Sequence, residues 1–212
     1  DPGAVGTLVH ALLKHPEAGV VIPKKLYHEQ PNAIWSAGAR YRPSPPAIIL
    51  KRTRTDDDGR YDGDTVLDYT PYCVCLFSRK LLEEVGLLDS VYHFFYEDYD
   101  HCIRARAAGY TVRFEPSARI WHKISKTIKG KKNTQFYRTN GRSHAIFCTK
   151  FPTEPYVANP NSQRYLLMRT KNEGRVSGWK AFREGYGQGR QETLTDPPGW
   201  REVQEPGQQV LE

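Results

Sequence analysis

The stretch FFYEDYDHCIRARAAGY, residues 94–110, decides the fold of this chain. Its apolar members recur at spacings of three and four, which is the period of one helix face: Tyr99, Cys102, Ile103 and Ala107. Gly109 follows at the position where a left-handed residue commonly ends a helix. The pattern therefore predicts a short amphipathic helix that ends just before Gly109.

Three acids gather at the start of this predicted helix: Glu97, Asp98 and Asp100. Because the helix dipole favours negative charge in the first turn, we expect lowered pKa values for Glu97 and Asp98. Read alone, such a cluster is the ordinary signature of a helix N-terminus. An acid that stays ionised near neutral pH can also accept a proton from a substrate.

A second stretch, FEPSARIWHK at residues 114–123, reads as strand, proline turn and strand. It delivers Trp121 and His122 to a strand end. Acids at a helix start and an imidazole at a strand end can face one site. Read alone, a histidine after a tryptophan is more often a packed, hydrogen-bonded residue than a ligand.

The rest of the pattern predicts an α/β protein with a helical C-terminal part. An amphipathic helix is expected at residues 3–15, and Ser78 is expected to cap a helix at residues 79–86. Strands are expected within residues 18–23, 32–41, 47–52 and 65–79. Further helices are expected at residues 133–151, with an interruption at Asn140-Gly141, and at residues 161–171 and 178–190, while the Pro-, Gly- and Gln-rich end is expected to be frayed.

Composition describes an ordinary soluble globular protein of 212 residues, 38% hydrophobic and 26% charged. No apolar run approaches the roughly 18 residues of a membrane span, and no secretory signal opens the chain. The four cysteines lack a paired CxxC spacing. This predicts reduced thiols of an intracellular protein rather than a structural zinc site.

The net charge of +7 is unevenly distributed. Residues 1–122 hold 15 basic and 16 acidic residues, whereas residues 123–212 hold 16 and 8. Such a basic part can attract phosphates, anionic lipid or nucleic acid, although solvated helix faces explain it about as well. The acid-rich run at residues 54–65 lacks the calcium-loop pattern and is expected to be a solvated turn.

Four blocks keep a characteristic order: YTPYCVCLFSRKLLEEVGLLD, FFYEDYDHCIRARAAGY, FEPSARIWHK and QFYRTNGR. Together they resemble the C-terminal half of a family 2, GT-A type glycosyltransferase, of the rhamnosyltransferase-like and galactofuranosyltransferase-like kinds. The resemblance implies a GT-A-like partial domain over residues 1–150, a small mixed sheet flanked by helices. It also implies a nucleotide-binding half upstream of Asp1. Residues 151–212 are then expected to form a basic helical extension with a flexible end.

The resemblance implies an inverting, metal-dependent sugar transfer. It places Asp98 at the family's catalytic base and gives Glu97 a role in orienting Asp98 or touching the acceptor sugar. Asp100 is expected to be a second acceptor-side acid or a structural one. His122 is a candidate ligand for a divalent metal, Mn²⁺ or Mg²⁺, and imidazole suits Mn²⁺ better.

Three aromatic residues complete the candidate site. Tyr96 and Trp121 are expected either to stack on sugar or nucleotide faces or to pack in the core. Tyr72 lies in the segment that lines the acceptor pocket in relatives. The family usually has Ser-Gly-Ala where this chain has Pro-Tyr-Cys at residues 71–73, which changes the expected acceptor preference.

The implied partners are a nucleotide-diphosphate sugar donor and a glycan or lipid-linked acceptor in cell-surface polysaccharide synthesis. The expected location is the cytoplasm, with the basic C-terminal part at the inner face of the plasma membrane. A homo-oligomer is left open, and no nucleic acid is expected. The alternative is a non-catalytic glycan-binding or assembly module of glycosyltransferase ancestry.

Overall fold

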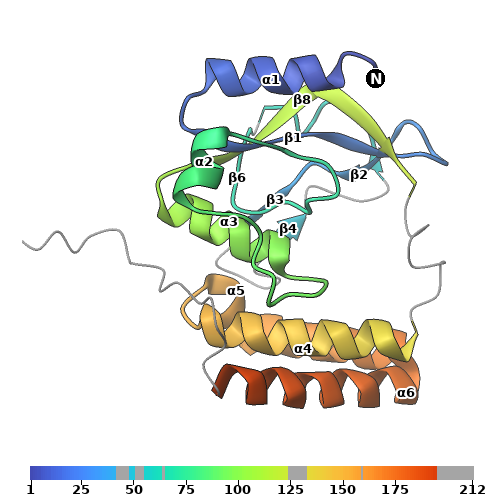
Figure 1. The fold of residues 1–212 in the computed structure, drawn as a ribbon. Helices are drawn as coiled ribbons and strands as arrows, with labels where there is room; N and C mark the ends of the chain where they lie inside the picture. The colour runs from blue at the N-terminus through green and yellow to red at the C-terminus, as the bar shows by residue number, and fades with distance from the viewer. Residues whose placement is uncertain (42–47, 51–54, 64, 124–132, 159, 195–212) are drawn as a thin grey trace, which may run out of the picture.

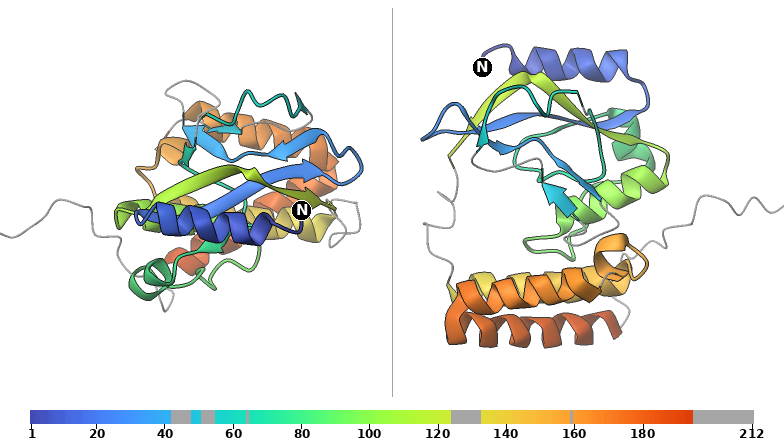
Figure 2. Two further views of the ribbon diagram at one scale, coloured as in Figure 1. Left: turned by 90° about the horizontal axis from the view of Figure 1, so that it is seen from above. Right: turned by 180° about the vertical axis from the view of Figure 1, so that it is seen from behind.

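The computed structural model describes residues 1–41, 48–50, 55–63, 65–123, 133–158 and 160–194. It shows a mixed α/β protein in which helices flank a small open mixed sheet (Figure 1). One helix lies on one face of the sheet, two lie on the other, and a layer of long helices lies beyond those two (Figures 1 and 2). The predicted small mixed sheet with flanking helices is confirmed.

A parallel pair of long strands forms the centre of the sheet, β1 (Ala18–Tyr27) and β8 (Thr111–His122). Every residue of β1 before Tyr27 is buried, which explains its nearly continuous apolar start. Short antiparallel strands complete the sheet, whose order is β5-β2-β1-β8-β6. These strands are β2 (Ala33–Ser36), β5 (Thr55–Asp56) and β6 (Val66–Leu67). A further strand, β7 (Leu76–Phe77), pairs with the first half of β1. A separate ribbon pairs β3 (Ala39–Tyr41) with β4 (Ile48–Leu50).

The predicted strand, proline turn and strand at residues 114–123 is one strand with a large bulge. Pro23 of β1 pairs with Glu115, but the next residue, Lys24, pairs with Arg119. Residues 116–118 of β8 therefore have no counterpart in β1, and the proline sits in this bulge rather than in a turn. Trp121 and His122 lie at the end of β8, as predicted, and they pair there with Leu26 and Tyr27 at the end of β1.

Each face of the central strands carries its own core. Helix α1 (Ala4–Lys14) confirms the predicted N-terminal helix, and its Leu8 packs with Val21 on one face. On the other face lie α2 (Arg79–Glu84) and α3 (Glu97–Ala107), whose cores join the central strands. The apolar residues of the sheet alternate between these two cores because successive side chains of a strand point to opposite faces.

Local signals set the ends of α2 and α3. The Oγ of Ser78 accepts the backbone N–H of Leu81 at 3.1 Å, so the predicted cap is confirmed. Gly109 has the predicted left-handed backbone, with φ of 85°. Unexpectedly, Phe95 and Tyr96 also have positive φ, 71° and 69°, which is unusual for bulky residues and strains the chain just before α3.

The segment at residues 65–79, predicted to be a strand, forms only the two-residue strands β6 and β7. The chain between them is irregular, with a turn at residues 72–73. Tyr69 makes an isolated bridge with Ala39, and its carbonyl accepts the Ala39 N–H at 2.7 Å. The segment therefore bends across the α3 side of the sheet rather than running through it.

The C-terminal helices form a layer of their own, α4 (Thr134–Lys150), α5 (Pro155–Ala158) and α6 (Pro160–Leu194). The predicted interruption of α4 at Asn140-Gly141 is wrong, because the helix is continuous. The residues between the two helices predicted after residue 160 are helical as well, so the two join into one helical element, α6, whose halves lie side by side (Figures 1 and 2). Glycines allow the helices to pack closely here. A Cβ at Gly141 would lie 2.1 Å from the carbonyl oxygen of Phe182 in α6.

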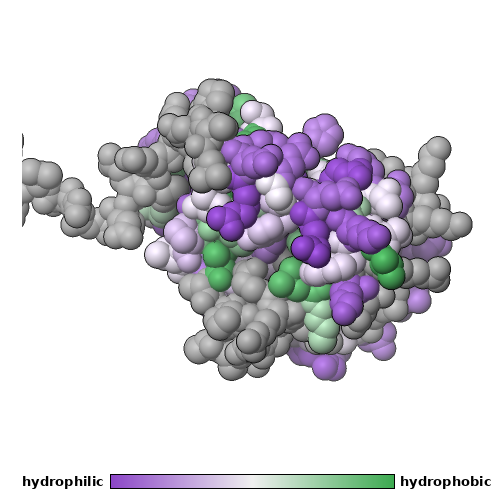
Figure 3. Space-filling model, turned by 90° about the horizontal axis from the view of Figure 1, so that it is seen from below, coloured by the Kyte–Doolittle hydropathy of each residue, from purple (hydrophilic) through white to green (hydrophobic). Residues whose placement is uncertain are grey.

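A third core fastens this helical layer to α3. It consists of Tyr92, Tyr99, Ile103, Ile146, Phe147 and Phe151. Helix α4 packs on both α3 and α6, so it connects the two predicted parts of the chain, residues 1–150 and 151–212. The boundary at residue 150 stays a prediction. The outer face of the layer is mostly hydrophilic where its side chains are described, with separate hydrophobic residues among them (Figure 3). Within the described residues, no helix has the length and apolar character needed to cross a membrane.

Candidate functional site

The candidate site lies at the start of α3, where Asp98 faces the segment at residues 69–72. The hydroxyl of Tyr69 donates a hydrogen bond to Oδ2 of Asp98 at 3.1 Å. The backbone N–H of Tyr99 donates to Oδ1 at 2.8 Å. The carboxylate is thus held at both oxygens.

Burial dominates the electrostatics of Asp98. The pKa of Asp98 is raised to about 7. Loss of solvent is the largest cause and the charge of Glu97 adds to it, while the hydroxyl of Tyr69 and the backbone amides of Tyr99 and Tyr72 oppose the rise. The lowered pKa predicted from the helix dipole is therefore wrong for Asp98. The dipole acts in the predicted direction, but desolvation is the larger effect.

Glu97 stands beside Asp98 as the sequence predicts. Its Oε2 is buried and has no hydrogen-bond partner among the described residues. A buried oxygen without a donor is unfavourable unless a ligand or water supplies one. Glu97 and Asp98 thus form a pair of neighbouring carboxyl groups, of which Asp98 titrates near neutrality.

Lys25 is a member of the site that the sequence reasoning missed. Its side chain is fully buried, and Nζ donates to Oγ1 of Thr70 at 3.1 Å and to the carbonyl of Pro71 at 2.5 Å. Burial lowers the pKa of Lys25, and Asp98 is among the nearby groups that oppose this. The available signal was a lysine pair directly after the apolar start of β1, at the edge where ligands bind in sheets of this kind.

Asp100, by contrast, lies in a buried ion-pair cluster. Its Oδ1 accepts Nε of Arg104 at 2.5 Å, and its Oδ2 accepts Nζ of Lys150 at 2.5 Å. Lys150 also pairs with Asp89 at 2.7 Å. The side chain of Asp100 has no exposed surface. Of the two roles expected for Asp100, this geometry favours the structural one.

The tyrosines of the predicted site pack inward. The ring of Tyr96 lies 5.0 Å from that of Phe147 in α4, centroid to centroid. The hydroxyl of Tyr72 is 3.0 Å from Nδ1 of His101, and Cys102 donates to the same hydroxyl. For both Tyr96 and Tyr72 the structure favours core packing over stacking on a ligand.

Trp121 and His122 occupy the end of β8. Trp121 is 41% exposed and donates from Nε1 to the carbonyl of Pro31 at 3.1 Å. The His122 ring lies 4.6 Å from the ring of Trp35. Burial and then the charge of Lys25 lower the pKa of His122, which favours its neutral form. Lys25 is thus within electrostatic range of both His122 and Asp98.

The described residues do not by themselves fit a divalent metal. Among them, no three His, Cys, Asp or Glu side chains gather into a group that could hold a metal ion. His122 would be a single ligand, and the ammonium group of Lys25 nearby opposes a second cation.

The acid-rich run after β5 is not simply a solvated turn, as the sequence suggested. Nζ of Lys24, which is fully buried, lies 2.6 Å from Asp57 and 2.7 Å from Asp62. Asp57 also pairs with Arg119 at 3.4 Å. The run therefore neutralises a buried lysine of β1 and fastens this loop to the sheet.

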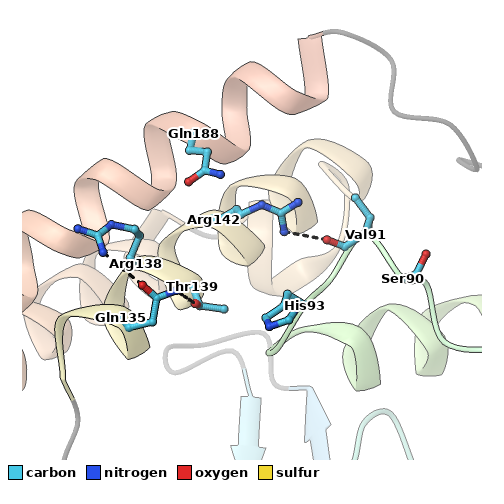
Figure 4. A pocket seen from close by; sticks show the side chains of 8 residues that line it. All are labelled: Ser90, Val91, His93, Gln135, Arg138, Thr139, Arg142 and Gln188. Atoms are coloured by element: carbon cyan, nitrogen blue, oxygen red, sulfur yellow. Dashed lines mark hydrogen bonds between the residues drawn. The ribbon is translucent and has the colours of Figure 1, made fainter.

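A pocket of about 340 Å³ lies elsewhere, between the helical layer and the chain before α3 (Figure 4). It is lined by Ser90, Val91, His93, Gln135, Arg138, Thr139, Arg142 and Gln188. Its two arginines already have partners: Arg138 pairs with Glu184, and Arg142 pairs with Glu192 and donates to the carbonyl of Val91. None of the predicted site residues lines this pocket.

The structure thus brings Asp98 and Glu97 together with Lys25 and places His122 at the neighbouring strand end. A comparison with models of known protein families found no match, and no curated protein is similar to the chain at a significant level. What the site can do chemically follows from its carboxyl pair: a half-buried acid with a pKa near neutrality can accept and release a proton at ordinary pH.

Proposed function

We propose that this chain carries the acceptor-binding and catalytic part of an inverting glycosyltransferase of the GT-A type. Its reaction would move a sugar from a nucleotide-diphosphate sugar to a glycan or lipid-linked acceptor. The observation that carries the proposal is the Asp98 carboxyl group, with its pKa of about 7 and its two fixed oxygens. The resemblance of the four sequence blocks supports the same reaction class.

In the proposed reaction, Asp98 accepts the proton of an acceptor hydroxyl as that oxygen attacks the anomeric carbon of the donor sugar. A new carbon–oxygen bond forms while the bond from that carbon to the phosphate oxygen breaks. The nucleoside diphosphate leaves with the electron pair, and attack opposite to it inverts the configuration. A base works best when its pKa lies near the working pH, and Asp98 meets this condition.

Glu97 would help to place the acceptor. Its buried oxygen without a donor can accept a hydrogen bond from a sugar hydroxyl, and its charge contributes to the raised pKa of Asp98. The partly exposed Trp121 and the ring pair of Trp35 and His122 lie at the carboxyl end of the parallel strands, where ligands of α/β sheets bind. An aromatic face at this edge suits a sugar ring.

The test is sugar transfer by the natural protein and by its Asp98→Asn variant. Release of nucleoside diphosphate would be measured with a panel of UDP- and dTDP-hexoses and a mixture of glycan acceptors. Removing a general base typically lowers the rate by about 10²–10⁴-fold, so the transfer rate of Asp98→Asn should be lower than that of the parent by this factor. The transfer rate of Glu97→Gln should decrease less, mainly because the KM for the acceptor is higher.

A matched control is Asp68→Asn, since among the described residues the donor to the Asp68 carboxylate is the backbone N–H of Tyr41. This variant should keep most of the transfer rate. If Asp98→Asn retained the parent rate with every donor that the parent uses, Asp98 would not be the base and the proposed mechanism would be wrong.

A further inference from the structure

Four consecutive residues of the chain, 69–72, connect the half-buried carboxyl group of Asp98 with the buried ammonium group of Lys25. The first and last of them serve Asp98: the Tyr69 hydroxyl donates to its Oδ2, and the Tyr72 backbone amide faces the same carboxylate. The middle two serve Lys25, whose Nζ donates to Oγ1 of Thr70 and to the carbonyl of Pro71. The segment therefore donates hydrogen bonds to the Asp98 carboxylate and accepts hydrogen bonds from the Lys25 ammonium group.

Packing alone does not explain a lysine at this position. A fully buried ammonium group loses its hydration, and both of its hydrogen-bond acceptors are neutral. Within the described residues, Lys25 has no carboxylate at ion-pair distance, whereas its neighbour Lys24 has Asp57 and Asp62. A methionine would fill the space of the Lys25 stem without a charge. The position therefore points to a role for the ammonium group.

We propose that Lys25 is a positioning residue for Asp98. By binding Thr70 and Pro71, the ammonium group fixes the segment that presents the Tyr69 hydroxyl and the Tyr72 amide to the carboxylate. This inference rests on the proposed function only for its effect on the rate. The geometric part concerns the Asp98 carboxyl group itself and can be measured without any substrate.

The expected direction can be derived from the groups that face Asp98. These ionisable neighbours are Glu97, Lys25, Tyr69, Tyr72, Cys73, Cys75 and Cys102. Hydrogen bonds to an ionised carboxylate lower its pKa, and so does a nearby positive charge. Loss of Lys25 removes the charge and loosens the two donors, so both effects raise the pKa of Asp98.

The experiment compares Lys25→Met with Lys24→Met, a matched control in the same strand with the same burial but different partners. The Asp98 carboxyl carbon would be titrated by NMR with ¹³C-labelled aspartate, and Asp98→Asn would assign the signal. Lys25→Met should raise the pKa of Asp98 by about 1 pH unit. Lys24→Met should leave it unchanged.

The consequence for transfer follows from the ionised fraction. With a pKa near 7, half of Asp98 is ionised at pH 7. A rise of about 1 pH unit would lower the rate at pH 7 about fivefold, and the rate should recover at pH 9. A merely destabilised enzyme would not recover in this way.

Thr70→Val provides a second variant if Lys25→Met does not fold. It removes one acceptor of Lys25 while conserving the volume of the buried side chain, and it should raise the pKa of Asp98 by a smaller amount. An unchanged Asp98 titration in Thr70→Val or in folded Lys25→Met would overturn the positioning role, whether or not the protein transfers sugar. A raised pKa in a protein without transfer would uphold it and count against the proposed function.

Discussion

At Asp98, two opposing effects act on one carboxyl group. A helix N-terminus favours a charged carboxylate by roughly 0.3–1 kcal/mol. A pKa of about 7, compared with an ordinary value of 3.8, corresponds to about 4 kcal/mol against the charged form. Burial therefore exceeds the dipole several-fold. The same difference appears in the stability of the folded protein, because protonation and folding are linked.

The stability of the protein should depend on pH through Asp98. The folded state binds the Asp98 proton up to about pH 7, whereas the unfolded chain releases it near pH 3.8, so this stabilisation is complete below pH 3.8 and is lost as pH rises through 7. Asparagine cannot ionise. Asp98→Asn should therefore unfold at a higher temperature than the parent at pH 8 and at a similar temperature at pH 4. At pH 8 the free energy of unfolding should differ by up to about 4 kcal/mol.

Thermal denaturation at pH 4, 6 and 8 checks this prediction. Asp58→Asn is the control, because Asp58 is exposed and its ion pair joins it to Arg60, two positions along the chain. That variant should show no gain in melting temperature at pH 8. A parent and an Asp98→Asn variant that melt together at pH 8 would show that Asp98 is not destabilised by ionisation.

Local signals made part of the site predictable at the level of single residues. The acids of α3, the Ser78 cap and the Gly109 cap depend on neighbours in the sequence, and the structure places them as expected. Lys25 depends on Thr70 and Pro71, which lie 45 and 46 positions away. Such contacts are properties of the folded chain, and so is the burial that raises the pKa of Asp98.

At the level of elements, the contact between α4 and α6 depends on glycines. A Cβ at Gly185 would lie 1.9 Å from the carbonyl oxygen of Arg138, and one at Gly189 would lie 2.4 Å from that of Arg142. The sequence reasoning treated Asn140-Gly141 as an interruption because glycine is a poor helix former. Here the missing side chains allow the two backbones to approach, and tertiary packing outweighs propensity.

A glycine substitution in α6 tests this contact. Gly185→Ala should destabilise the protein by about 1–3 kcal/mol, because the added methyl group meets backbone that cannot move aside easily. Gly187→Ala lies in the same helix, but its methyl group would meet nothing within 4 Å. It should be neutral or stabilising by up to about 1 kcal/mol. Urea denaturation measures both, and equal effects of the two variants would contradict the close approach.

At the level of the whole molecule, Lys150 ties the helical layer to the rest of the protein. Its Nζ, at the end of α4, pairs with Asp100 in α3 and with Asp89 before that helix. Lys150 and Asp100 are both nearly or fully buried. Removing one partner from such a cluster leaves charge without compensation in the interior, which is strongly unfavourable.

Lys150→Met should therefore destabilise the protein by roughly 3–5 kcal/mol at pH 7. Hydrogen exchange of the α4 amides should also increase, because the layer loses a fastening to α3. The control is Lys80→Met, since Lys80 is 73% exposed and its pair with Glu84 on α2 has no buried member. That variant should change stability by less than about 0.5 kcal/mol. A loss for Lys150→Met as small as that for Lys80→Met would contradict the role of the cluster.

The layers of the molecule were only partly visible in the sequence. Hydrophobic periodicity predicted the α/β class and most helices, because each depends on a local repeat. It did not predict that most of residues 65–79 is irregular chain, that the residues between the two predicted helices of 161–190 are helical as well, or that β8 carries a bulge. Each of these results depends on which surfaces meet after folding.

The parallel pairing of β1 with β8 also has a consequence for how the chain acquires its structure. The first residue pair of this ladder, Ala18 and Thr111, is separated by 93 positions in the sequence. During translation at about 5–20 residues per second, β1 must wait roughly 5–20 s for its central partner. Until then, its apolar residues and one strand edge stay uncovered, so the nascent chain passes through a period in which chaperones can bind it and aggregation competes with folding.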